Sequence, residues 1–127
     1  MTKVVFNACY GGFGLSDEAI QRYAEIAGIT LYSRTDEYGF TSWCRVPAEE
    51  YEQLKGSERN DAYFSVYDIE RTDPALVQVV EELGDRANDT YSELYIEELL
   101  EGTRYRIDEY VGLESVMTID DYDWRIA

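Results

Sequence analysis

Two segments of this chain carry a start signal, an apolar stripe and a stop signal of an amphipathic helix, and together they limit the possible folds. Ser16 is a typical N-cap and Gly28 a typical stop for a helix over 17–27. Asp73 and Gly84 bracket a second helix in the same way. Apolar residues recur at helical spacing in both: Ile20, Tyr23, Ala24 and Ala27, then Leu76, Val79, Val80 and Leu83. Each stripe needs an apolar surface to pack on.

The other apolar segments are short and rich in strand-forming residues. Strands are expected over 3–9, 29–33, 40–45, 62–69, 92–100, 103–111, 113–119 and 122–126. A short helix is expected over 47–55, followed by a polar loop over 56–61. This order predicts an α+β fold, with a mainly antiparallel sheet, two to three helices packed on one face and a C-terminal β-hairpin. The length favours a single globular domain, 1–127.

The charge of the chain is strongly negative and unevenly distributed. It has 27 acidic and 11 basic residues and no histidine, a formal net charge of −16. Residues 61–127 alone hold 18 acidic and 5 basic residues. Because duplex binding requires Lys and Arg to neutralise phosphates, this balance argues against direct binding of free nucleic acid or of an anionic membrane. Solubility and adaptation to high salt are alternative reasons for such acidity.

The sequence predicts neither a membrane segment nor a leader. No stretch approaches the ~20 consecutive apolar residues of a membrane helix. The N-terminus has a single basic residue, Lys3, and no cleavable apolar segment. Two cysteines, Cys9 and Cys44, do not make a disulfide scaffold, so a reduced, cytoplasmic state is expected.

A glycine-rich loop over 11–14 lies between the first strand and the first helix, where many proteins hold a phosphate. However, Asp17 and Glu18 already place two carboxylates in the first turn of that helix, and the lysine of a Walker motif is absent. The favoured interpretation is a tight turn in which glycine supplies positive φ. The alternative is a small-ligand site, of nucleotide type, formed by Gly11, Gly12, Phe13 and Gly14.

No catalytic constellation stands out. Cys9 lies beside the glycine loop, but the chain has no histidine to activate it, so a buried structural thiol is expected. Asp120, Asp121 and Asp123 offer a weak surface cation site as the alternative to a solvated acidic face, although EF-hand spacing is absent. We therefore predict no metal, no cofactor and no enzymatic activity.

Three blocks, CYGGFGLSDEA, ERTDPALVQVVEELGDRAN and YRIDEYVGLESV, span most of the chain. Together they resemble a family of small, uncharacterised proteins encoded by tailed bacteriophages and prophages. The family usually has Asp-Gly at the turn of its closing hairpin, whereas this chain has Val111-Gly112. This departure weakens the prediction of a tight type I′ turn.

The resemblance implies a phage-encoded accessory protein that acts in the host cytoplasm. Such a protein would bind a host protein and modulate or inhibit it, as an anti-defence factor or a nucleic-acid mimic. The acidity favours a basic, nucleic-acid-binding partner. We expect the interaction surface to include Asp85, Asp89, Glu93, Glu97 and Glu98. The alternative function is binding or sequestering of a nucleotide-type ligand by the glycine loop; the oligomeric state is not predicted.

Overall fold

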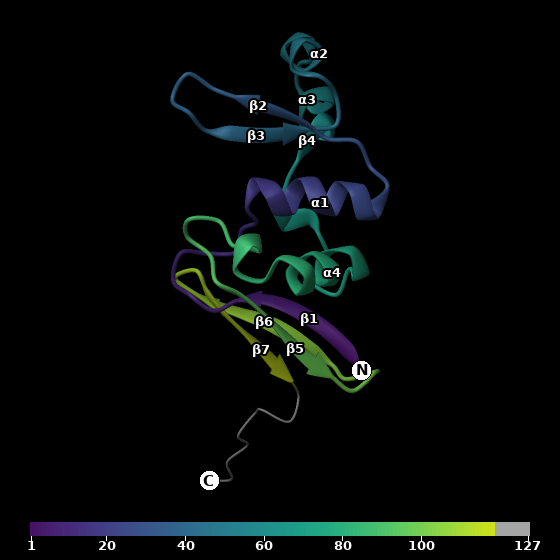
Figure 1. Ribbon diagram of the computed structural model, residues 1–127, viewed down its shortest axis with the longest axis vertical. Coiled ribbons are helices and arrows are strands. Elements are labelled where there is room, and N and C mark those ends of the chain that lie inside the picture. Colours follow the sequence, from purple (N-terminus) through teal and green to yellow (C-terminus); the bar gives the residue numbers. More distant parts are fainter. Residues whose placement is uncertain (119–127) are drawn as a thin grey trace.

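The computed structural model describes residues 1–118 (Figure 1). Its α-helices are α1 (Asp17–Ala27), α2 (Ala48–Gln53), α3 (Ser57–Ala62) and α4 (Pro74–Leu83), with 3₁₀ turns η1 (Val66–Asp68) and η2 (Gly84–Ala87). Its strands are β1 (Thr2–Asn7), β2 (Tyr32–Thr35), β3 (Thr41–Cys44), β4 (Tyr63–Phe64), β5 (Leu94–Leu99), β6 (Tyr105–Tyr110) and β7 (Leu113–Thr118). The predicted α+β class and C-terminal hairpin are confirmed. The strand expected over 122–126 lies outside the described residues.

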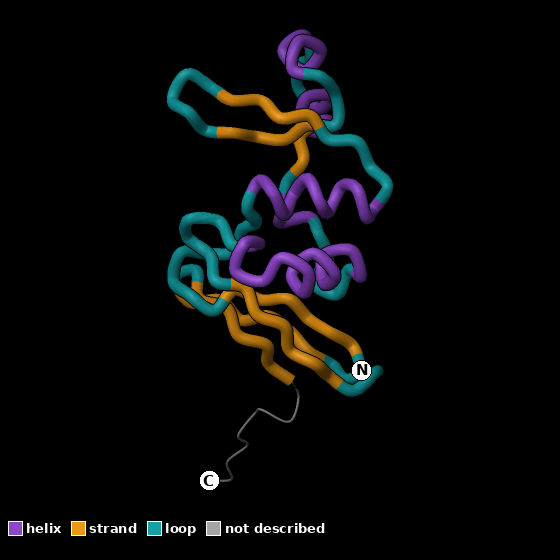
Figure 2. The backbone as a smooth tube through the Cα atoms, viewed as in Figure 1, coloured by secondary structure: helices purple, strands orange, loops and turns teal. Residues whose placement is uncertain are grey.

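The strands pair in three antiparallel ladders, β1–β5, β2–β3–β4 and β6–β7. Figure 2 shows β1, β5, β6 and β7 gathered on one side of α4, while α1 lies between α4 and the β2–β3–β4 ladder. The strands that were expected to form one sheet are therefore divided into two groups. The layer formed by α1 and α4 lies between these two groups. The short helices α2 and α3 lie beyond β2–β3–β4 (Figure 1).

The predicted caps of both long helices are formed. Ser16 Oγ accepts a hydrogen bond from the amide of Ala19 at 3.1 Å, and Gly28 ends α1 in the left-handed region with φ 74°. Asp73 caps α4 by accepting from the amide of Ala75 at 2.8 Å. Most residues of the two stripes lie in one core cluster that also includes residues of β1, β3 and β4: Val5, Trp43 and Phe64. Ala27, at the end of the first stripe, is exposed.

The segment over 56–61, expected to be a polar loop, is helical in the structure, as α3. Its polar composition gives no apolar stripe, but tertiary contacts hold it in place. The guanidinium of Arg59 lies 4.9 Å from the ring centre of Tyr51, and Ala62 is buried. The strand expected over 62–69 is correspondingly reduced to β4, followed by η1.

Candidate functional site

The glycine loop is packed against the protein's own chain. A Cβ atom on Gly11 would overlap the carbonyl of Tyr91, and one on Gly14 would overlap the carboxylate of Asp89. Gly12 has φ 92°, which favours glycine. Glycine is therefore required here for close approach and for backbone conformation, as the tight-turn interpretation predicts.

The start of α1, next to this loop, carries two carboxylates, and each of them already has a partner within the chain. Asp17 accepts a hydrogen bond from the indole Nε1 of Trp43 at 3.0 Å, and Glu18 pairs with Arg86 at 2.8 Å. A cavity of about 180 Å³ adjoins Phe13 and Gly14, and its lining residues include Asp89 but no Lys or Arg. A ligand-binding role of Gly11, Gly12, Phe13 and Gly14 stays a prediction.

The β6–β7 turn rests on the glycine loop. Tyr110 pairs with Leu113, so the loop between the strands has two residues, Val111 with φ 48° and Gly112 with φ 87°. Two positive φ values are what a type I′ turn requires. The Val-Gly sequence therefore does not prevent a tight turn, but it places a β-branched side chain in the left-handed region, which is unfavourable.

Asn7 joins the loop, the turn and β5 from the end of β1. Its side chain is fully buried, and its Nδ2 donates to the carbonyls of Cys9 at 2.7 Å and Gly112 at 2.9 Å. Its Oδ1 accepts from the amide of Glu93 at 2.8 Å. The side chain thus satisfies three backbone groups from three segments, and it fixes their relative positions.

An ion pair between the buried Glu114 and the part-buried Arg71 completes this network. Arg71 donates to both carboxylate oxygens of Glu114, with N–O distances of 2.6 and 2.8 Å. The same carboxylate accepts from the amide of Asn7 at 2.9 Å. The Arg71 guanidinium also lies 3.6 Å from the ring centre of Phe13 in the glycine loop. The pair therefore ties β7, the free edge of β1 and the glycine loop together.

This network was not predicted from the sequence. One feature of the sequence points to a buried ion pair. Glu114 and Val116 are two residues apart in an expected strand, so their side chains lie on the same face of it, and Glu114 is therefore a charged residue at an inward position. Glu114 and Val116 are both buried in the structure, with exposed fractions of 7% and 9%. Arg71 carries no comparable signal, because it lies in the turn before α4.

Neither thiol has the surroundings of a nucleophile. Cys9 Sγ lies 3.0 Å from the carbonyl oxygen of Tyr91 and 3.4 Å from Oδ1 of Asn7, both hydrogen-bond acceptors. Cys9 is partly rather than fully buried, whereas Cys44 is buried, and this burial raises the pKa of its thiol. Within residues 1–118, no group of three or more Cys, Asp or Glu side chains is placed to hold a metal ion. Asp120, Asp121 and Asp123 lie outside the described residues.

The five predicted surface acids are all exposed, and none forms an ion pair with another residue of the described chain. Asp85 lies on η2, Asp89 and Glu93 lie on the loop after it, and Glu97 and Glu98 lie along β5. Strand alternation divides the acids in and just before β5. Glu93 and Glu97 share the face of Tyr95, about 13 Å apart at ~3.4 Å per residue, whereas Glu98 lies opposite Lys3 on the other face.

Comparison with family models, curated proteins and solved structures finds no match to this chain. The geometry above is therefore what bears on function. Over residues 1–118, no helix has the length and apolar character needed to cross a membrane.

Proposed function

We propose that this protein is an acidic accessory protein, of the phage-encoded type, that binds and inhibits or modulates a host protein through a basic surface of that partner. The observation that supports the proposal is the group of five exposed acids without ionic partners in the described chain: Asp85, Asp89, Glu93, Glu97 and Glu98.

Several other acids of the described chain are neutralised by neighbouring bases. Glu82, for example, pairs with Arg22 at 2.8 Å, Glu81 with Lys3 at 3.1 Å, and Glu114 is saturated by Arg71. The negative charge of the five surface acids, in contrast, is not offset by an ion pair in the described chain. The electrostatic field of these acids attracts a basic protein surface. A nucleic-acid-binding protein carries such a surface by necessity.

The experiment is capture of partners from a bacterial host lysate by the immobilised protein, at about 50 mM and 500 mM NaCl. At the higher concentration the screening length falls to a few ångströms. We expect a basic protein at low salt and its loss at high salt, with identification by mass spectrometry. A partner that is retained at both concentrations and has an acidic or neutral surface would contradict the proposal.

A further inference from the structure

Three segments that are distant in sequence meet beyond the end of β1. A Cβ atom on Gly112 would lie 2.5 Å from the carbonyl oxygen of Tyr10 and 2.7 Å from the amide nitrogen of Gly12. A Cβ atom on Gly11 would overlap the carbonyl of Tyr91. The β6–β7 turn, the glycine loop and the loop before β5 therefore touch one another through their backbones.

Large side chains project into solvent from this junction. Tyr10 is 64% exposed, Tyr91 71%, Tyr110 72% and Val111 69%, and we call these four residues the tip. Single exposed apolar residues are ordinary on a soluble protein, but a cluster from three touching segments is typical of a recognition surface. Tyrosine suits this use because it offers a large, rigid contact area and a polar end at low entropic cost.

The backbone beneath the tip is held firmly. The buried Asn7 side chain donates to the carbonyls of Cys9 and Gly112, and Glu114 beside the turn is fixed by Arg71. A surface that is already ordered loses little conformational entropy when a partner binds. The backbone that carries the tip is therefore preorganised for contact.

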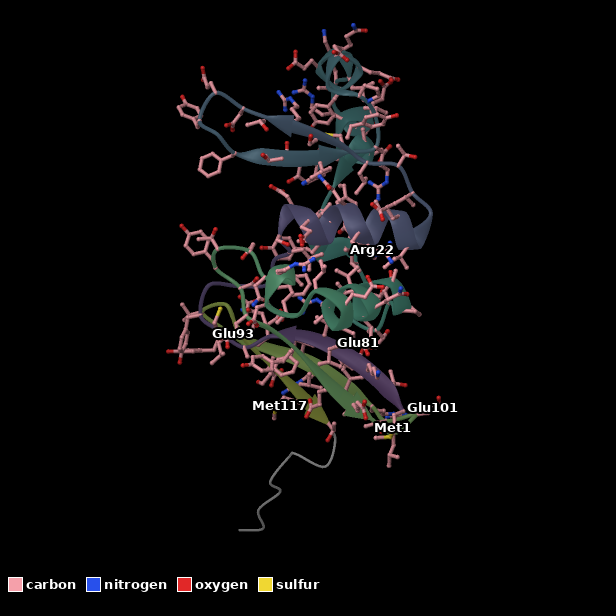
Figure 3. The ribbon with its side chains drawn as sticks, in the orientation of Figure 1. Met1, Arg22, Glu81, Glu93, Glu101 and Met117 are labelled. Atoms are coloured by element: carbon pink, nitrogen blue, oxygen red, sulfur yellow. The ribbon has the colours of Figure 1, made fainter. Side chains whose placement is uncertain are left out.

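The surroundings of the tip are acidic. Asp89 accepts from the amide of Tyr91 at 2.8 Å, Glu109 precedes Tyr110, and both carboxylates are exposed. Glu93 lies at this end of the strands, away from Met1 and Glu101 (Figure 3). None of the three acids forms an ion pair within residues 1–118, and the segments 8–14, 88–93 and 108–113 contain no Lys or Arg.

We propose that the tip is the anchor of the interface and that it binds an arginine-rich segment of the partner protein; this inference rests on the proposed function. Guanidinium groups stack on tyrosine faces, and their N–H groups donate to carboxylates at the same time. An arginine-rich segment can therefore bind both to the tyrosine rings of the tip and to the acids around it, whereas a lysine ammonium interacts mainly with the acids. A second copy of this chain is a poor occupant, because it would bring the same acids against each other.

The test is titration of the intact protein with two peptides of equal charge, octa-arginine and octa-lysine, followed by calorimetry at about 50 mM NaCl. The test variant carries Tyr10→Ser, Tyr91→Ser and Tyr110→Ser. The matched control carries Tyr38→Ser, because Tyr38 is 78% exposed and follows Asp36 and Glu37 in the β2–β3 loop. Circular dichroism establishes that both variants are folded.

We expect octa-arginine to bind several-fold more tightly than octa-lysine, and the triple variant to lose at least about tenfold in affinity for octa-arginine, because three cation–π contacts are removed together. The control should bind as the native protein does. Equal affinity for both peptides, or an unchanged affinity of the triple variant, would contradict the tip as an arginine-binding anchor but not the proposed binding of a basic partner. Failure of both peptides to bind would contradict both the anchor and the proposed function. Self-association that the triple variant abolishes would assign the tip to a second copy instead.

Discussion

Val111 is the only non-glycine residue of the described chain with a positive φ, and it is β-branched. Its side chain is 69% exposed, so packing does not offset the strain. The backbone conformation at Val111 is imposed by its neighbour Gly112. Gly112 is held against the glycine loop, and its carbonyl accepts a hydrogen bond from Asn7. The chain therefore tolerates an unfavourable residue at a turn that its tertiary contacts impose.

Val111→Asn should stabilise the protein, because Asn adopts the left-handed region at lower cost and Asn-Gly is a preferred type I′ sequence. We expect a gain of about 1 kcal/mol, which corresponds to roughly 3–6 °C in Tm for a domain of this size. Thermal unfolding followed by circular dichroism measures it. Val111→Thr keeps the branch and should give no gain. A Tm for Val111→Asn at or below the native value would show that the turn is not formed as described.

Gly11→Ala should be strongly destabilising, because the added methyl group overlaps the carbonyl of Tyr91 rather than a flexible side chain. Such overpacking costs about 2–3 kcal/mol. Gly28→Ala is the control, since the Cβ there meets open space and the cost is only that of φ 74°, about 1 kcal/mol. Urea unfolding of both variants provides the comparison. Equal losses would mean that the glycine loop is not pressed against residue 91.

Among the elements, the β6–β7 hairpin depends on a single buried carboxylate. Glu114→Gln should cost at least about 2 kcal/mol, because it leaves the largely buried Arg71 guanidinium, 16% exposed, without its counter-charge. Glu109→Gln is the matched control: Glu109 faces Glu114 across the ladder but is exposed, so its change should stay within about 0.5 kcal/mol. Denaturant unfolding measures both. Similar free energies of unfolding for the two variants would contradict a structural role of the pair.

The packing of α1 on α4 should make the protein sensitive to high pH. Tyr23 on α1 donates to Asp73, the cap of α4, at 2.7 Å, and burial together with this carboxylate raises the pKa of Tyr23 to about 12. The folded chain thus holds this proton more tightly than the unfolded chain, whose tyrosines titrate near 10. The resulting stability is complete below about pH 10 and is lost as the pH rises toward 12.

Tyr23→Phe should therefore weaken the dependence of the free energy of unfolding on pH between about 10 and 12. At neutral pH the same variant should lose about 1–2 kcal/mol, the contribution of a hydrogen bond to a charged group. Urea unfolding at a series of pH values tests both expectations. A pH profile identical to that of the native protein would exclude Tyr23 as a source of the alkaline sensitivity.

Elements with local signals could be predicted from the sequence. Both long helices lie where their caps and stripes place them, and the closing hairpin turns at Gly112, between the two predicted strands. Helix α3 could not be predicted, because the contact of Arg59 with Tyr51 that supports it is tertiary. The same limit applies to the site: Arg71 and Glu114 are 43 residues apart, and only the inward position of Glu114 indicated a buried partner.

The molecule as a whole separates its charge into neutralised and available parts. Acids near Arg22, Lys3, Arg71 and Arg86 are paired, whereas the acids of η2, β5 and the loop between them have no ionic partner in the described chain. Exposed acids on other elements, such as Glu37 and Glu49, also have none. A net charge of −16 alone keeps a protein soluble, so the location of the charge, rather than its amount, distinguishes an interface from a solubilising surface.

Two charge-reversed variants separate these possibilities. The first changes the five proposed interface acids to Lys: Asp85, Asp89, Glu93, Glu97 and Glu98. The second changes five exposed acids on other elements that also have no ion pair in the described chain: Glu37, Glu49, Glu50, Glu58 and Asp61. The two sets alter the net charge equally, and circular dichroism establishes that each variant is folded.

The decisive measurement is the association rate constant of each variant with the basic partner captured from host lysate, as a function of NaCl concentration. We expect the native rate to fall by at least about tenfold between low and high salt, as steered association does. The first variant should bind slowly at every salt concentration, and the second should retain most of the native rate and its salt dependence. Equal rates for the two variants would contradict an interface on η2, β5 and the loop between them.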